Sequence, residues 1–397
     1  MTNQYSVAAH WSDDFNDASL QGWAENLRQQ LSAPSVSVGL VFMAPKYFPR
    51  ARQILEILRV HARIPLLAGC SSQGLIVNGE EIEENAGLTL ALYHLPNGEF
   101  KATHFSQEQV EEANGPGYWI MESGVEPEQT NGWLAFINPF NVDSESWLSG
   151  WNEAYAPLPV MGGLASGNYN AQQTQVYLNG EVFEEGGVAL SVGGEVQISG
   201  ITSQGCTPIG ETWTLTRVDR NIIQEIGNRR AYDVLAETFS ALTPDQQRQA
   251  RGNLFIGMVV NEYLDDFHRG DFLIRNLLQA DPKTGNVAVG ALPRQGQTVQ
   301  FQRRSAEAAT EDMTELLKRA RREMNKNNKL VYGACLCCCN GRGRNLFGEP
   351  NHDARMVQQH LGPLGLAGFF CNGEIGPVGE KNFLHGYTAS LALFAQK

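Results

Sequence analysis

The sequence has 397 residues, of which 42% are hydrophobic and 18% are charged. This composition excludes a disordered chain and predicts a folded one with room for two ordinary domains. The 30 Lys and Arg against 43 Asp and Glu give a formal net charge of −13, which disfavours binding to nucleic acid or to an anionic membrane surface.

The lack of a recognisable targeting signal and the cysteine usage both predict a cytoplasmic protein. The N-terminus lacks a basic segment followed by an apolar one, and no stretch approaches about 18 consecutive apolar residues. We therefore expect neither a secretory signal nor a membrane span. The seven cysteines are an odd number, and four of them crowd into positions 335–339. Reduced thiols fit this pattern better than a disulfide framework does.

A three-part unit recurs along the chain: an apolar strand, a stretch leading to a proline-initiated apolar run that ends in glycines, and a glycine-led strand. The parts begin at Ser35, Ile64 and Ala86 in the first copy, at Asn131, Leu158 and Glu185 in the second, and at Asn327, Gly362 and His385 in a weaker third. We expect the first two copies to share one strand–helix–strand–strand arrangement in an N-terminal domain, with their proline-led runs as equivalent strands.

Helical periodicity predicts helices over 50–62, 222–242 and 305–326, the last with Thr310 as a candidate cap. Strand-like runs separated by Gly-Asn and Gly-Gln turns lie within 251–304. The fold class is therefore α/β or α+β, with mixed β-sheets flanked by helices. We predict an N-terminal extension over 1–34, one domain over 35–215 and a second over 216–397, with the boundary near 205–213.

Two glycine-rich segments could face a ligand. GCSSQG contains Gly69, Ser71 and Ser72, and GGLASG contains Gly162 and Gly163. Glycines at a strand end let backbone amides approach a ligand, and the serine hydroxyls could bind an oxygen. We favour the alternative that both segments are repeated corners between strand and turn. Neither segment fits a P-loop or a dinucleotide-binding fingerprint.

The segment CLCCCNGRG is unusual because of its four cysteines. On a strand, Cys335, Cys337 and Cys339 share one face and Cys338 points to the other. We favour packing in the core, ahead of thiols that line a ligand site and ahead of a metal site. A metal site would need further ligands, for which Cys371 and His385 are available. A thiol enzyme using Cys339 or Cys70 has no recognisable base nearby in the sequence.

Arg342 and Glu374 are the charged candidates. Arg342 lies between two glycines after an apolar strand, where its planar fork suits a carboxylate or phosphate. Glu374 lies in an apolar stretch and must be paired or have a perturbed pKa. If the two preceding strands are neighbours, both side chains reach one sheet edge. They would then form a structural ion pair or bind the two charges of a zwitterion, with Arg275 as a reserve cation.

These segments together resemble the FIST family, the F-box and intracellular signal transduction proteins. The resemblance extends over about 35–394 and rests on PLLAGCSSQG, PVMGGLASG, DFLIRNLL, CNGRG, FFCNGEIGP and GYTASLALF in that order. It implies paired N- and C-terminal FIST domains and an intracellular sensory module for small ligands, with amino acids among the suggestions. Family members are often fused to histidine kinases, chemotaxis receptors or cyclases.

The resemblance makes particular positions of interest. They are Cys339, Gly341 and Arg342 in CNGRG, Asn372, Gly373 and Glu374 in CNGEIG, Arg275 in LIRN, and the glycines of GCSS and GGLA. The two halves leave no room for an output domain, and the segment before Ser35 is too short for an F-box. The resemblance thus implies a free-standing, non-enzymatic bacterial-type sensor that acts on a separate partner such as a sensor kinase. We expect no cofactor, with a haem or metal sensor as the alternative, since some members are linked to haem and nitric oxide.

Overall fold

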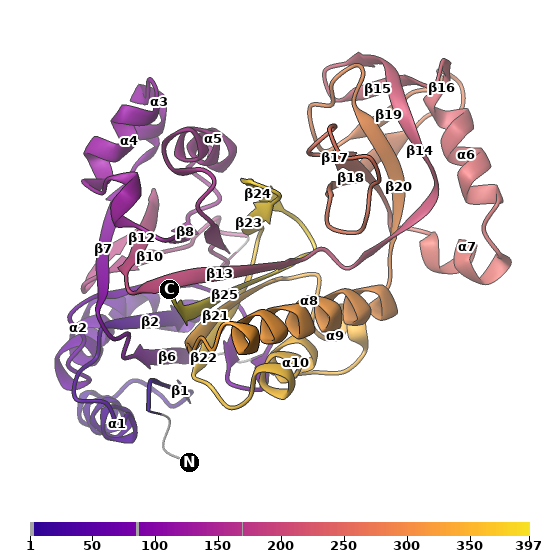
Figure 1. The fold of residues 1–397 in the computed structure, drawn as a ribbon. Helices are drawn as coiled ribbons and strands as arrows, with labels where there is room; N and C mark the ends of the chain where they lie inside the picture. Colours follow the sequence, from indigo (N-terminus) through magenta and orange to yellow (C-terminus); the bar gives the residue numbers. More distant parts are fainter. Residues whose placement is uncertain (1–3, 85–86, 169) are drawn as a thin grey trace. The chain divides into compact units, whose positions relative to one another are not determined.

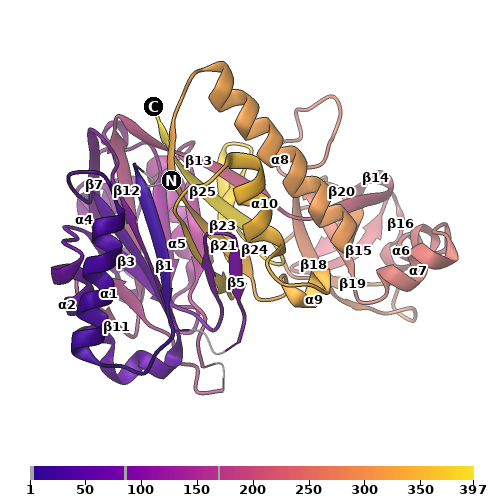
Figure 2. The same cartoon turned by 90° about the horizontal axis from the view of Figure 1, so that it is seen from below.

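The computed structural model describes residues 4–84, 87–168 and 170–397. They form two compact units, of which unit 1 combines Met1–Thr202 with Thr314–Lys397 and unit 2 is Ser203–Met313. The expected boundary near 205–213 is close to the start of unit 2. The expected continuous domain over 216–397 is nevertheless divided, because the last part of the chain belongs to unit 1 (Figures 1 and 2).

Unit 1 contains the predicted module three times. Each copy pairs two strands in parallel and adds a third strand antiparallel to the first of them. The strands are β2 (Val38–Met43), β3 (Leu67–Ser71) and β6 (Leu88–Tyr93), then β8 (Trp133–Ile137), β9 (Val160–Leu164) and β12 (Gly187–Gly194), then β21 (Val331–Cys339), β22 (Leu366–Cys371) and β25 (Ala389–Gln396). The shared arrangement of the first two copies is confirmed, and both proline-led runs are strands. Ala86 lies outside the described residues.

A helix connects the two parallel strands of each copy, which is the usual crossover between parallel strands. These helices are α2 (Ala51–His61), α5 (Ser144–Tyr155) and α10 (His352–Leu361). The predicted helix over 50–62 is therefore confirmed. In α2, the residues at helical spacing, Ile54, Leu55 and Leu58, are buried. They belong to the apolar cluster that this helix forms with its own sheet.

An additional strand flanks each copy. These strands are β1 (Ser6–Trp11) beside β6, β7 (Gly98–Phe105) beside β12, and β13 (Val196–Ser203) beside β25. The predicted extension over 1–34 is therefore a part of unit 1, since it supplies β1 and α1 (Asp17–Gln30). The remaining helices of the described chain in unit 1 are η1 (Pro45–Arg50), α3 (Gln107–Glu112), α4 (Pro116–Ser123), η2 (Pro127–Gln129) and α9 (Arg344–Phe347).

The three copies exchange β-hairpins in a cycle. The hairpin of each copy follows its second parallel strand and joins the sheet of another copy. In the first copy β4 (Leu75–Val77) and β5 (Glu80–Ile82) join β22, in the second β10 (Val176–Leu178) and β11 (Glu181–Phe183) join β3, and in the third β23 (Glu374–Val378) and β24 (Lys381–His385) join β9. Three six-stranded sheets result.

The central core of unit 1 lies where the three copies meet. Phe42, Phe136 and Phe369 come from different copies and contact one another with ring centroids 4.7–5.9 Å apart. Within each copy the parallel strands approach closely at a glycine. A Cβ at Gly69 would lie 1.8 Å from the Val41 carbonyl oxygen, and one at Gly368 would lie 1.8 Å from that of Leu336. This close approach supports the structural interpretation of the glycine segments.

Unit 2 is a closed β-barrel. Its order is β14 (Cys206–Asp219), β20 (Thr298–Arg304), β17 (Leu254–Val259), β18 (Phe272–Ala280), β19 (Val287–Val289) and β15 (Ile222–Ile226), and β14 also pairs with β15. The strands predicted within 251–304 are confirmed. Strand β16 (Arg229–Arg230) and helices α6 (Ala231–Ser240) and α7 (Pro244–Ala250) complete the unit.

The prediction of one helix over 222–242 is wrong at its start. Residues Ile222–Ile226 form strand β15, which pairs with both β14 and β19, and the helix begins only at Ala231. Isoleucines favour strands, and pairing on both sides decides for the sheet. Helix α8 (Ala306–Lys326) confirms the prediction over 305–326. Its N-terminal cap is Ser305, whose hydroxyl accepts a hydrogen bond from the Ala308 amide at 3.1 Å, whereas Thr310 lies inside the helix.

Candidate functional site

The carboxyl ends of the three parallel strand pairs meet at one place in unit 1. Backbone hydrogen bonds join the last residues of β3, β9 and β22 to the segments that follow these strands: Ser166 N to Ser71 O at 3.2 Å, Phe370 N to Gly74 O at 2.9 Å, and Leu164 N to Gly373 O at 2.8 Å. Proteins with parallel sheets commonly bind their ligands at the carboxyl ends of the strands. The meeting point of three such ends is therefore the candidate site.

Buried serines form the inner part of this site. The Ser166 hydroxyl donates to the Phe370 carbonyl at 2.6 Å and lies 3.2 Å from the Ser72 hydroxyl. The Ser71 hydroxyl donates to the Ser166 carbonyl at 2.9 Å. Two of these serines were candidate ligand residues, and the structure brings both to the meeting point. Their hydroxyls already bond to protein groups, so they hold the three copies together there.

Amide side chains form the outer part of the site. Gln73 and Asn372 are exposed and Asn340 is half-buried. The Asn340 side chain donates to Oδ1 of Asn372 at 2.8 Å, and Asn372 donates in turn to the Ala165 carbonyl at 3.0 Å. The backbone N–H of Gln73 donates to the Ser166 hydroxyl at 3.0 Å, and its side-chain NH₂ group donates to the Gly167 carbonyl. We call Gln73, Asn340 and Asn372 the amide rim.

The rim shows what sequence reasoning found and missed. The expected neighbourhood of the strands before CNGRG and CNGEIG is confirmed, because β21 and β22 pair in parallel with Cys339 opposite Cys371. Asn372 was a candidate residue, whereas Gln73, Asn340 and Ser166 were not. Gln73, Ser166 and Asn372 each stand four residues after the close-approach glycine of their copy, Gly69, Gly162 and Gly368. Aligning the repeats on these glycines would have revealed the three positions.

Glu374 is a fully buried carboxyl group beside this rim. Its Oε2 accepts a hydrogen bond from the Thr388 amide at 2.9 Å, and its Oε1 accepts one from the Cys371 thiol at 3.1 Å. Burial raises the pKa of Glu374 to about 8, although these hydrogen bonds and the Arg342 charge act in the opposite direction. The perturbed pKa expected from the sequence is thus present, and the carboxyl is largely uncharged at neutral pH.

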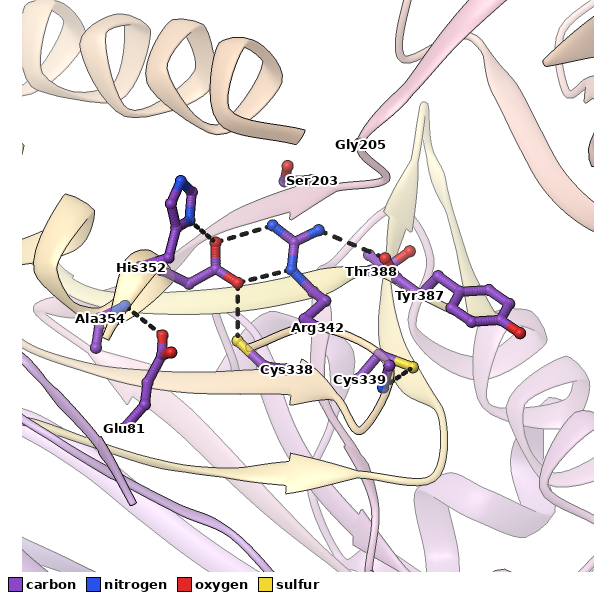
Figure 3. A network of polar contacts seen from close by, with 12 residues as sticks. Glu81, Ser203, Gly205, Cys338, Cys339, Arg342, His352, Ala354, Tyr387 and Thr388 are labelled. Atoms are coloured by element: carbon purple, nitrogen blue, oxygen red, sulfur yellow. Dashed lines mark hydrogen bonds and ion pairs between the residues drawn. The ribbon is translucent and has the colours of Figure 1, made fainter. Parts of the chain in front are cut away.

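Arg342 is fully buried and forms a bidentate ion pair with Asp353 (Figure 3). Its Nε donates to Oδ2 at 2.6 Å and its Nη2 donates to Oδ1 at 2.9 Å. Burial alone would raise the pKa of Asp353, but the charge and hydrogen bonds of Arg342, with a hydrogen bond from His352, hold it well below its usual range. The interpretation that Arg342 pairs with Glu374 is corrected here, since Asp353 takes that position.

The sequence carried no signal for Asp353, which lies on α10 outside every motif. Glu81, on β5, was missed for the same reason. Its Oε1 accepts a hydrogen bond from the Ala354 amide at 2.9 Å, and burial together with the Asp353 charge raises its pKa to about 7. The hairpin exchange brings Glu81 from the first copy to α10 of the third.

The cysteines occupy the faces that the sequence predicted. Cys335 and Cys337 lie in the central core with Cys371, whereas the Cys338 thiol faces Asp353 at 3.6 Å. Burial raises the pKa of the thiols of Cys337, Cys338, Cys371 and also Cys70 well above the usual value. These four thiols are therefore protonated at neutral pH, and each needs a base to take its proton before it can act as a nucleophile.

No group of three or more His, Cys, Asp and Glu side chains within 4–84, 87–168 and 170–397 is arranged to hold a metal ion. The two suggested ligands have other contacts: the Cys371 thiol donates to Glu374, and Nε2 of His385 lies 3.0 Å from the Gly376 carbonyl. The haem or metal alternative stays a prediction.

Of the remaining candidate residues, three glycines lie in unit 1 and Arg275 lies in unit 2. Gly163 and Gly373 lie in the site, where a Cβ on Gly163 would stand 2.9 Å from the Gly373 carbonyl oxygen. Gly341 donates its backbone N–H to the Cys339 sulfur at 3.5 Å. Arg275 lies on β18 of unit 2, half-buried, with Nη1 donating to the Ile274 carbonyl at 3.3 Å. The site described here is built from unit 1 alone.

Family comparison agrees with the two halves of the sequence. Residues 37–229 match the FIST N domain and residues 231–377 match the FIST C domain. The chain belongs to the FIST family. FIST domains are recognised as sensory domains in signal transduction.

Its relatives include uncharacterised proteins of Mycobacterium tuberculosis and Mycobacterium bovis, each 33% identical over 371 residues and covering 94% of both chains. An uncharacterised protein of Methanocaldococcus jannaschii is 23% identical over 255 residues, which are 62% of this chain and 47% of that protein. Among solved structures, a cyanuric acid hydrolase described as "evolutionary innovation by structural concatenation" aligns over 98% of this chain and 100% of its own at a TM-score of 0.34 and 8% identity.

Within the described ranges, the FIST chain contains no helix that is both long and apolar enough to cross a membrane.

Proposed function

We propose that this FIST protein is a cytoplasmic, non-enzymatic sensor that binds a small polar ligand at the amide rim and signals to a separate protein, such as a sensor kinase. The observation that carries the proposal is the meeting of three parallel carboxyl ends, with Gln73, Asn340 and Asn372 around it. Membership of a family of sensory domains supports the same role.

The chemistry of the rim suits a ligand that both donates and accepts hydrogen bonds. Each amide side chain offers an acceptor oxygen and a donor NH₂ group. Gln73 and Asn372 are exposed, and the NH₂ group of each donates one hydrogen bond to a backbone carbonyl, so its second hydrogen is the one that a solute would accept. Amino acids are the class to test first, because the family resemblance suggests them and because a zwitterion carries donors at one end and acceptors at the other.

Arg342 and Glu374 support the rim in this proposal and do not contact the ligand's charges. The Nε and Nη2 atoms of Arg342 are occupied by Asp353, and both carboxyl oxygens of Glu374 accept hydrogen bonds from the protein. Both residues are fully buried. They fix the turns from which Asn340 and Asn372 project, since each stands two residues after one of these asparagines.

A ligand at this point would act on all three copies of the module at once. Its binding energy would favour the arrangement in which the three strand ends are together, and the surfaces of the copies would transmit that shift to a partner. Such a sensor requires no chemical conversion of the ligand.

The test begins with mass spectrometry of small molecules released from the denatured protein, followed by calorimetry with that compound and with a panel of amino acids. Removing one neutral hydrogen bond loses about 0.5–1.5 kcal/mol, so Asn340→Ala and Asn372→Ala should each weaken binding roughly three- to tenfold. The control is Asn26→Ala, which changes an exposed asparagine on α1. Unchanged affinity in the double rim variant would place the ligand elsewhere. If no compound is released and no binding heat is measured, the sensor proposal is rejected.

A further inference from the structure

We propose that Cys339 and Cys371 form a reversible disulfide when the protein meets hydrogen peroxide, so that the carboxyl ends of β21 and β22 are a redox modification site. This inference does not depend on the ligand proposed above. It rests on the pairing of two thiols across neighbouring strands and on the carboxyl group that they share.

The pairing places the two cysteines directly opposite each other. Cys339 on β21 is the register partner of Cys371 on β22. Neighbouring strands lie about 4.8 Å apart, which falls within the Cα separation of about 4.4–6.8 Å that a disulfide spans. Register partners point to the same face of a sheet, and Cys337, Phe369 and Cys371 on this face all lie in the central core.

The two thiols differ in accessibility, which gives them different roles. Cys339 is half-buried, and its sulfur accepts the backbone N–H of Gly341 at 3.5 Å (Figure 3). Peroxide reacts with the thiol that it can reach. Cys371 is buried, so oxidants reach it less readily. Cys339 is therefore the thiol that is oxidised first, and Cys371 resolves it.

Glu374 connects the two thiols. Its carboxyl group is hydrogen-bonded by the side chains of both Cys371 and Cys339. In its ionised form it can take the proton of either thiol and return it to a leaving oxygen. Because its pKa is raised to about 8, the ionised form of this carboxyl is a stronger base than an ordinary carboxylate and can accept a thiol proton.

The reaction balances with one molecule of hydrogen peroxide. The Cys339 thiolate attacks one peroxide oxygen and breaks the O–O bond; the other oxygen leaves and becomes water on taking up the proton released by the thiol. Cys339 is then a sulfenic acid. The Cys371 sulfur attacks the Cys339 sulfur, the S–S bond forms, and the hydroxyl leaves as a second water with the proton that Cys371 gave to Glu374. Two thiols are oxidised and the peroxide is reduced to two waters.

The other thiols do not have these properties together. Cys70, Cys335 and Cys337 are buried in the central core, and the Cys338 thiol faces Asp353 on the opposite side of the sheet. Among the seven cysteines of the chain, all of which are reduced in this structure, Cys339 alone is not fully buried.

The experiment treats the reduced full-length protein with a small excess of hydrogen peroxide, blocks the remaining thiols by alkylation, and maps tryptic peptides without reduction. Cleavage after Lys and Arg puts Cys339 in peptide 330–342 and Cys371 in peptide 356–381. We expect a disulfide that links these two peptides and disappears on treatment with dithiothreitol. Cys339→Ser and Cys371→Ser should abolish the link, and the matched control Cys337→Ala on the same face of β21 should retain it.

Several results would overturn the proposal. They are a link from peptide 330–342 to the Cys70 peptide, a disulfide confined to 330–342, persistence of the link in Cys339→Ser, and complete alkylation after peroxide. Glu374→Gln gives a second test that needs no cysteine change: it should slow disulfide formation roughly tenfold or more, because the proton acceptor is lost. An unchanged rate would remove Glu374 from the mechanism. Thermal melting of every variant verifies that it is folded.

Discussion

The buried charge of Arg342 has a partner that is buried as well. The Arg342 guanidinium and the Asp353 carboxylate are 0% and 1% exposed, so each depends on the other for compensation. Such an ion pair adds little stability compared with a well-packed pair of apolar side chains. Removing one partner, however, leaves a buried charge with nothing to neutralise it.

We predict that Asp353→Asn lowers the free energy of unfolding by about 3–5 kcal/mol. Urea denaturation of the unmodified protein and of this variant measures the difference. The control is Arg52→Gln, which breaks an exposed pair with Glu181 and should change stability by less than about 1 kcal/mol. If Asp353→Asn were as mild as the control, the pair would not be a structural requirement.

Glu374 makes stability depend on pH. Because its pKa is raised from 4.5 to about 8 on folding, the folded state holds a proton that the unfolded state has lost between these values. Its stabilising contribution is fully present below about pH 4.5 and is lost as the pH rises through about 8. Glu374→Gln should therefore flatten the decline in stability between pH 5 and about 8.5, measured by urea denaturation in a pH series. Parallel curves for the two proteins would contradict the raised pKa. Glu81, whose pKa is raised to about 7, also lowers stability as the pH rises. That decline ends near pH 7 and is the same in the unmodified protein and in Glu374→Gln.

At the level of secondary-structure elements, close contact between paired strands explains why glycine recurs. Gly368 stands against the Leu336 carbonyl in the third copy as Gly69 stands against the Val41 carbonyl in the first. The contact is with backbone, which cannot move aside as a flexible side chain can. A methyl group at this position must therefore separate the two parallel strands.

We predict that Gly368→Ala destabilises the protein by about 3 kcal/mol or more, or prevents folding, because the added Cβ would overlap the backbone of β21. Gly386→Ala is the matched control, since a Cβ there meets nothing within 4 Å. Thermal denaturation compares the two. Equal melting temperatures would mean that the strands can separate without loss.

How far the sequence predicted this fold depends on the range of the interactions. Strand β3 and helix α2 were predictable because their signals are local: an apolar run before Gly69, and buried residues at helical spacing. The position of Glu81 beside α10 depends on a hairpin inserted into the sheet of another copy. Residue patterns carry no signal for such long-range pairing. Strand β15 was assigned to a helix because its isoleucines fit both periods until pairing decided between them.

On the scale of the whole molecule, the net charge of −13 opposes binding to polyanions. The one dense basic segment, with Lys318, Arg319, Arg321 and Arg322, lies on helix α8, where Arg321 donates to the His360 carbonyl at 3.0 Å. Positive charge in the C-terminal half of a helix is stabilised by the helix dipole. This segment therefore has a structural explanation.

We predict no appreciable binding of duplex DNA at physiological salt. Fluorescence anisotropy with a labelled duplex, titrated at two salt concentrations, measures it. Submicromolar affinity that falls with rising salt would contradict this prediction, and loss of that affinity in a variant with the four basic residues neutralised would identify α8 as its source.

The cyclic exchange of hairpins has a consequence for the order in which the chain folds during synthesis. The ribosome completes β4 and β5 early, but their sheet partner β22 is made only near the end, where Val77 meets Ala367. Until β22 has been synthesised, the hairpin of β4 and β5 therefore has an unpaired edge that other chains can contact. A nascent chain of this protein can close unit 1 only after its third copy has emerged, so it has a greater need of chaperone protection than a fold built from independent repeats.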